Sequence, residues 1–189
     1  MVLALPVVIG LAAAFLFRGD VMRIAALRLR RLELFYIAIG IQLVIFPFAF
    51  LPWSVTDTVA KSLWLVSYAV LAVGAVLNRR IPGVPVIAAG MLSNIAAVVA
   101  NGGHMPALPA ALRAAHKSYA LQYNSIAKAS PHLSWLVDRW AVPRWLHVGN
   151  VFSVGDVLIG AGVVVLIFAA SGASLALRVG RSGVGVEPT

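Results

Sequence analysis

Five long apolar runs constrain the fold of this chain more than any other feature. A helix needs about 20 apolar residues to cross a bilayer, with a range of about 17–25. The first run is marginal at 16 residues, and the other four qualify at 17 to 20 residues. We therefore expect an all-α integral membrane bundle of five transmembrane helices, forming a single domain over residues 1–172. The runs cover residues 2–17, 34–53, 58–77, 82–100 and 154–170.

Composition excludes the main alternatives. Hydrophobic residues make up 61% of the 189 residues and charged residues 11%, against about 45–50% and about 25% in ordinary soluble domains. A soluble domain of this size has too little interior to bury so much apolar surface, so soluble, disordered and coiled-coil folds are excluded. The chain has no cysteine, which excludes disulfide frameworks, thiolate zinc sites and iron–sulfur clusters.

Positive charge lies between the runs and predicts their orientation. Lysines and arginines number five in residues 18–33, one in 54–61 and two in 78–81, with two more in the tail. Because positive loops favour the cytoplasmic side, we expect the N-terminus outside, the C-terminus inside and a flexible cytoplasmic tail over 173–189. The net charge of +9 then serves orientation and contact with lipid headgroups. We expect the lipid bilayer as partner, and no nucleic acid.

Local signals mark the helix ends and the packing faces. No positive residue precedes the first run, so a retained helix is favoured over a cleaved signal peptide. Ser54-x-x-Asp57 and Ser153-x-x-Asp156 have the form of capping boxes, and Pro47 should kink the second helix. Small residues at helical spacing predict close helix packing, and these are Gly10, Ala14, Ala89, Ser93, Ala97, Gly155, Gly160 and Gly162.

The segment 101–153, between the fourth and fifth runs, holds all four histidines and three of the five tryptophans. Apolar residues at helical spacing predict one short helix from Leu108 to Tyr119, and residues 131–141 predict a second. Since Trp and Tyr favour the headgroup layer, we expect these pieces to be outer interfacial helices. Asp138 beside Arg139 is expected to form a surface ion pair.

Polar residues at the facing ends of the fourth and fifth helices are the candidate ligand-binding residues. Both helix ends lie on the outer side, so their side chains could meet in one outward-facing pocket. Asp156 is the sharpest candidate, because ionisable groups within spans are costly; alternatively, it only caps its helix. The amides, like that of Gln42, could instead bond neighbouring helices. The candidates are Asn94, Asn101, His104, Asn150, Ser153 and Asp156.

Signals for metal binding and catalysis are weak. The four histidines are 12, 16 and 15 residues apart, without the i, i+3 or i+4 spacing of helical metal sites. We therefore expect no metal or haem site, and the sequence identifies no cofactor. There is no G-x-S-x-G or H-E-x-x-H motif, and we assign no catalytic residue. A triad of Ser153, His147 and Asp156 can be drawn, but nothing in the spacing requires it.

Two motifs carry a resemblance to a known family. They are Asn101-Gly-Gly-His-Met-Pro106 and Asn150-Val-Phe-Ser-Val-Gly-Asp-Val-Leu-Ile159. With them, the chain resembles an uncharacterised family of bacterial multi-pass membrane proteins, a domain of unknown function with N-G-G-x-M-P and V-F-S-x-G-D-V-L-I motifs. The Pro-rich stretch of that family is only partly matched here by Val137 to Trp145. The resemblance implies a location in the bacterial cell (inner) membrane, and it implies no activity.

Three classes of function stay open. The first is binding or transport of a small polar or lipid-headgroup ligand at the outward-facing pocket between the fourth and fifth helices. The second is a non-catalytic membrane subunit or assembly factor with another membrane protein as partner. The third, which we favour least, is a lipid-directed enzyme that uses His104 or Asp156 as acid–base. A self-contained carrier is disfavoured, because many carriers consist of inverted repeats and none is evident.

Overall fold

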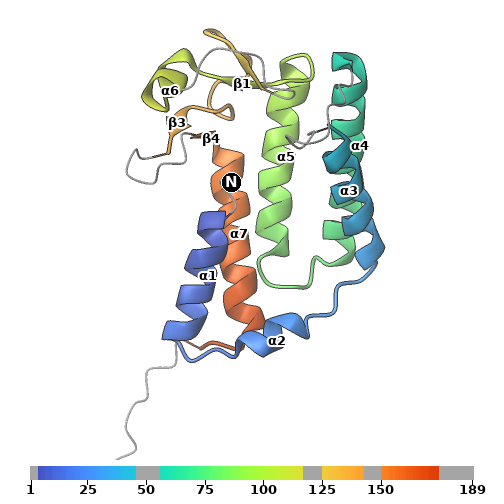
Figure 1. Cartoon of the computed structure of the whole chain (residues 1–189), viewed down its shortest axis with the longest axis vertical. Helices are drawn as coiled ribbons and strands as arrows, with labels where there is room; N and C mark the ends of the chain where they lie inside the picture. The colour runs from blue at the N-terminus through green and yellow to red at the C-terminus, as the bar shows by residue number, and fades with distance from the viewer. Residues whose placement is uncertain (1–3, 46–55, 117–124, 143–149, 175–189) are drawn as a thin grey trace, which may run out of the picture.

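The computed structural model describes residues 4–45, 56–116, 125–142 and 150–174 (Figure 1). Its long helices begin within two residues of the starts of the five apolar runs, so the helical character of the described parts of these runs is confirmed. Pro47 and the kink expected there lie outside the described residues. The long helices are α1 (Ala4–Leu16), α3 (Leu32–Ile45), α4 (Asp57–Leu77), α5 (Val84–Ala100) and α7 (Val154–Ala170).

One helix of the described structure is long and apolar enough to cross a membrane. This is α4, with 21 residues. The helices α1, α3, α5 and α7 are also apolar, but they are shorter, at 13 to 17 residues. The described part of the protein is thus mostly helical, with one candidate membrane span.

The five long helices lie side by side in the order α1, α7, α5, α4, α3 (Figure 1). Along the direction of the helix axes, the row has two ends. The short helix α2 (Val21–Ala25) and the α4–α5 turn lie at one of these ends, which we call the arginine end. The strands and the short helix α6 (Pro109–Ala114) lie at the opposite end, which we call the strand end. Helix α5 ends at the strand end, and α4 and α7 begin there.

Glycines allow α5 and α7 to pack with their backbones in contact. A Cβ atom on Gly90 would lie 2.5 Å from the carbonyl oxygen of Gly155, and one on Gly162 would lie 2.7 Å from that of Gly83. The two glycine pairs are two helical turns apart on both helices, in antiparallel register. Residues without bulky side chains let helices approach this closely. The packing role predicted for the glycines of α7 is confirmed.

A partly buried hydrogen bond joins the next two helices of the row, α4 and α3. The side-chain amide of Gln42 on α3 donates to the hydroxyl oxygen of Ser67 on α4, at 2.7 Å. That hydroxyl donates in turn to the carbonyl oxygen of Trp64, at 2.7 Å. The role predicted for Gln42, bonding to a neighbouring helix, is confirmed.

Short strands occupy parts of the segment 101–153, for which the sequence predicts two short interfacial helices. Strand β1 (Met105–Ala107) pairs in parallel with β2 (Ser125–Ala127), and β3 (Trp140–Ala141) pairs antiparallel with β4 (Val151–Phe152). The helix predicted over residues 131–141 is wrong. The backbone of Asp138 bonds to Pro106 and Leu108 at 3.0 and 2.9 Å, so this segment lies along the free edge of β1.

The first short helix is confirmed only over the six residues of α6. The chain leaves the helix at His116, whose φ of 53° is left-handed, and Tyr119 lies outside the described residues. The surface ion pair expected for Asp138 and Arg139 is also wrong. Asp138 is buried, and the guanidinium of Arg139 lies 5.3 Å from the ring centroid of Trp140. In an extended segment, neighbouring side chains point to opposite sides, which explains why Asp138 and Arg139 do not pair.

Candidate functional site

The N-terminus of α7 is closed by a reciprocal cap. The hydroxyl oxygen of Ser153 accepts a hydrogen bond from the backbone N–H of Asp156, at 3.1 Å. The Oδ2 atom of Asp156 accepts one from the backbone N–H of Ser153, at 3.0 Å. These bonds satisfy two backbone donors that the first helical turn leaves unpaired. The capping box predicted here is confirmed.

Asn94 on α5 joins this cap to the neighbouring helix. Its Nδ2 atom donates to Oδ1 of Asp156, at 3.1 Å, and its Oδ1 accepts from the hydroxyl of Ser153, at 2.9 Å. Ser153 and Asn94 are buried, and Asp156 is partly buried. Helices α5 and α7 therefore meet at one polar network of Asn94, Ser153 and Asp156, which we call the Asn94 network.

In the Asn94 network, Asp156 both caps its own helix and bonds to the neighbouring helix. One carboxylate oxygen caps α7, and the other accepts a hydrogen bond from α5. Since buried polar groups are costly when unpaired, the amide, the hydroxyl and the carboxylate satisfy one another. The arrangement is suited to holding α5 against α7.

Asn101 performs a different task from Asn94. It follows the last residue of α5, and its Nδ2 donates to the carbonyl oxygens of Ala97 and His132, at 2.8 and 2.9 Å. Its Oδ1 accepts from the backbone N–H of His132, at 2.9 Å, and from the ammonium of Lys128, at 3.0 Å. Asn101 thus ties the loop after β2 to the end of α5.

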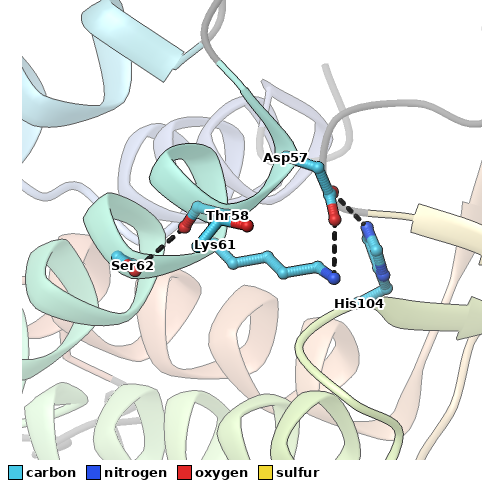
Figure 2. Close-up of polar contacts among 5 residues, drawn as sticks. All are labelled: Asp57, Thr58, Lys61, Ser62 and His104. Atoms are coloured by element: carbon cyan, nitrogen blue, oxygen red, sulfur yellow. Dashed lines mark hydrogen bonds and ion pairs between the residues drawn. The ribbon is translucent and has the colours of Figure 1, made fainter.

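His104 belongs to a third cluster, with Asp57 and Lys61, which are not among the candidate residues predicted from the sequence (Figure 2). Its Nε2 lies 2.8 Å from Oδ1 of Asp57, and the ammonium of Lys61 lies 2.7 Å from Oδ2 of the same carboxylate. The side chain of His104 is 10% exposed and that of Asp57 is 51% exposed. The Asp57-x-x-x-Lys61 spacing, one helical turn at the outer end of a run, is the signal that could have found this pair.

Asp57 occupies a different helical position from the one predicted. The expected Ser54-x-x-Asp57 capping box is wrong, because α4 begins at Asp57 and the N-cap residue is Thr56, whose side chain makes no capping bond. Ser54 itself lies outside the described residues. The side chain of Asp57 is left to bind Lys61 and His104.

Charge and turn geometry both favour this third cluster. The carboxylate of Asp57, the first residue of α4, contacts the ammonium of Lys61 and the imidazole of His104. A Cβ atom on Gly103, whose φ is +93°, would lie 3.0 Å from Cδ of Lys61. The turn after α5 thus fits around the Lys61 stem because it has glycine there.

The contacts divide the candidate residues among separate clusters. Asn94, Ser153 and Asp156 meet, whereas Asn101 and His104 bond to other partners. The reason is that the two glycines after Asn101 carry the chain away from α5 and towards α4. Asn150 lies beside β4, where its carbonyl oxygen accepts from the backbone N–H of Val142, at 2.8 Å.

Two further sequence hypotheses concern metals and catalysis. In the part of the chain that the structure describes, no group of three or more His, Asp and Glu residues could hold a metal ion. His147, needed for the triad that can be drawn with Ser153 and Asp156, lies outside that part. The hydroxyl of Ser153 is instead engaged with Asn94.

Comparisons with known proteins give one match. We found no similar protein among curated sequences and no similar fold among solved structures. The model of a family of unknown function, DUF5317, matches residues 26–168, about three quarters of the chain. The match covers α3 to α5 and the segment up to Phe168 near the end of α7. The chain therefore belongs to the DUF5317 family, whose function is unknown.

Proposed function

We propose that this protein is a multi-pass protein of the bacterial cell membrane. In this proposal α1, α3, α4, α5 and α7 cross the bilayer, with the strand end outside and the arginine end in the cytoplasm. Exposed apolar side chains along the row support it, because soluble proteins rarely expose large apolar surfaces. Examples are Phe15, Leu16, Tyr36, Leu92 and Val99.

The distribution of charge supports the same orientation. The arginine end carries seven arginines against two acidic residues, Asp20 and Glu33. The described residues of the strand end carry four basic and three acidic residues. An excess of positive charge favours the cytoplasmic side. The four basic residues are Lys61, Arg113, Lys128 and Arg139, and the three acidic residues are Asp57, Asp138 and Asp156.

Labelling of single cysteines tests the spans and their orientation. The chain contains no cysteine, so an introduced one is the sole thiol. Ser130→Cys at the strand end should react with a membrane-impermeant maleimide in intact cells. Ala26→Cys at the arginine end should react only after permeabilisation; both positions are exposed. The unsubstituted protein is the control. Equal labelling of the two variants in intact cells would contradict the proposal.

Within the membrane we propose a non-catalytic role, as a subunit or assembly factor that binds another membrane protein. The observation that carries this is the Asn94 network, whose groups bond to one another across α5 and α7. A pair of polar groups that satisfy each other stabilises the helix pair but leaves little bonding capacity for a substrate. His104 and Asp156 lie in separate clusters, which disfavours a shared acid–base role.

Ligand binding is the second candidate function. It is favoured by one observation, the partial exposure of Asp156. A small polar molecule or a lipid headgroup between α5 and α7 would have to replace Asn94 as the hydrogen-bond donor to that carboxylate.

Native mass spectrometry of protein extracted gently from its own membrane separates the two candidates. We expect a recurrent second polypeptide that the Asp156→Asn variant retains. A recurrent small molecule that Asp156→Asn abolishes would contradict the subunit role and support ligand binding. Extraction of Gln42→Ala provides a matched control, since that variant also removes a polar side chain that bridges two helices.

A further inference from the structure

A buried asparagine joins two segments at the arginine end. Asn78 follows α4, and its Oδ1 accepts a hydrogen bond from the backbone N–H of Arg30, at 2.8 Å. Its Nδ2 donates to the carbonyl oxygens of Arg30 and Gly74, at 3.0 and 2.8 Å. The segment that leads into α3 is therefore held against the α4–α5 turn, although Arg30 and Asn78 are 48 residues apart.

The bonds of Asn78 bring together two segments that carry five exposed arginines. In the described part of the chain, Arg31 has the one carboxylate partner among them, Glu33 at 3.4 Å, and both side chains are well exposed. An exposed pair of this kind contributes little. Since like charges repel, a bound anion would stabilise this excess of positive charge. The five, which we call the arginine clamp, are Arg28, Arg30, Arg31, Arg79 and Arg80.

We propose that the arginine clamp binds the phosphate group of an anionic phospholipid in the cytoplasmic leaflet. Guanidinium groups match the geometry of phosphate oxygens and can bind them in a bidentate manner. Apolar side chains of α3 and α4 lie directly beside the clamp and are exposed, namely Leu32, Val76 and Leu77. They offer contacts to acyl chains, which a free phosphate does not have. The inference rests on the proposed membrane orientation.

Lipid retention by the purified full-length protein tests the proposal. The probes are phosphatidylglycerol and phosphatidylcholine with identical acyl chains, added in equal amounts in detergent and counted by native mass spectrometry. We expect preferential retention of phosphatidylglycerol. A juxtamembrane arginine contributes about fivefold in affinity, so Arg79→Gln/Arg80→Gln should weaken retention about 25-fold. Arg113→Gln at the strand end is the matched control and should leave retention unchanged.

Two further measurements separate a built site from diffuse charge and from a phosphate site. Asn78→Ala keeps all five arginines but removes the bonds that hold the backbone of Arg30 to the end of α4, so we expect several-fold weaker retention. Unchanged retention would overturn the built site. Displacement of phosphatidylglycerol by millimolar inorganic phosphate would assign the clamp to free phosphate and overturn the lipid proposal. Resistance to this displacement is expected.

Folding and membrane orientation are measured in separate experiments. Thermal unfolding of each variant identifies loss of fold, in which case Arg28→Gln/Arg31→Gln repeats the test on the other segment. Retention of the two lipids in equal amounts by the unsubstituted protein would overturn the lipid site. Cysteine labelling reads the membrane orientation independently, so failure of the lipid site and failure of the proposed spans give different results.

Discussion

Replacing Gly155 with alanine should separate α5 from α7 and lower the thermal stability of the protein strongly. The new Cβ atom would lie 2.6 Å from Cγ of Asn94 and 2.7 Å from the carbonyl oxygen of Gly90. Overpacking typically destabilises by about 1–3 kcal/mol. Here one obstacle is backbone, which cannot rotate away, so we expect about 3 kcal/mol or more. In a protein of this size that lowers the melting temperature by roughly 6–12 °C.

The chain offers a matched control for this substitution. Gly40 also lies within a helix, and a Cβ atom there would meet nothing within 4 Å. Alanine is favoured over glycine in a helix by about 0.5–1 kcal/mol, so Gly40→Ala should leave stability unchanged or raise it. Gly160→Ala should fall between the two, because its Cβ would contact the side chain of Pro6, at 2.9 Å. Thermal unfolding in detergent micelles measures all three. Equal melting temperatures for Gly155→Ala and Gly40→Ala would contradict the close backbone packing.

Features that depend on neighbouring residues could be predicted from the sequence. The five helices follow from apolar runs, and the cap of α7 follows from the Ser153-x-x-Asp156 spacing. Both arise within a few residues of chain, where helical geometry determines which residues are neighbours. The packing role of Gly155 also follows from its residue type, although its partner, Gly90, does not.

Features that depend on distant pairing could not be predicted in this way. Residues 131–141 have a local helical pattern, but the edge of β1 supplies hydrogen bonds that hold Asp138 in an extended conformation. Asn101 lies two turns beyond Asn94, yet α5 ends at Ala100, so helical periodicity no longer relates the two side chains. Tertiary pairing overrides local preference in such segments.

The position of the His104 cluster could have been predicted from the topology of the apolar runs. Placing the end of the fourth run and the start of the fifth on one side also places the start of the third run there. Asp57 stands at that start, and Lys61 follows one turn later. Sequence alone does not supply the contact itself, because the turn geometry of Gly102 and Gly103, with φ values of +78° and +93°, directs His104 towards α4.

A double-mutant cycle should show that Asp156 and Asn94 act together. An asparagine at position 156 has one acceptor oxygen in place of two, so Asp156→Asn keeps either the bond from Ser153 N–H or the bond from Asn94. We expect this substitution to cost about 1–2 kcal/mol of unfolding free energy. Asn94→Ala should cost about 2–3 kcal/mol, because the buried hydroxyl of Ser153 also loses its acceptor.

In the double variant, the two costs should not add. If Asp156 both caps α7 and binds α5, the cost of Asp156→Asn should fall by about 1 kcal/mol when Asn94 is already alanine. If Asp156 only caps its helix, the cost should be the same in both backgrounds, which would refute the role of the Asn94 network in joining α5 to α7. The parallel cycle of Asp156→Asn with Asn101→Ala is the control, since Asn101 bonds to Ala97, Lys128 and His132 instead. Additive costs there, with coupled costs at Asn94, would attribute the coupling to this one contact between the helices.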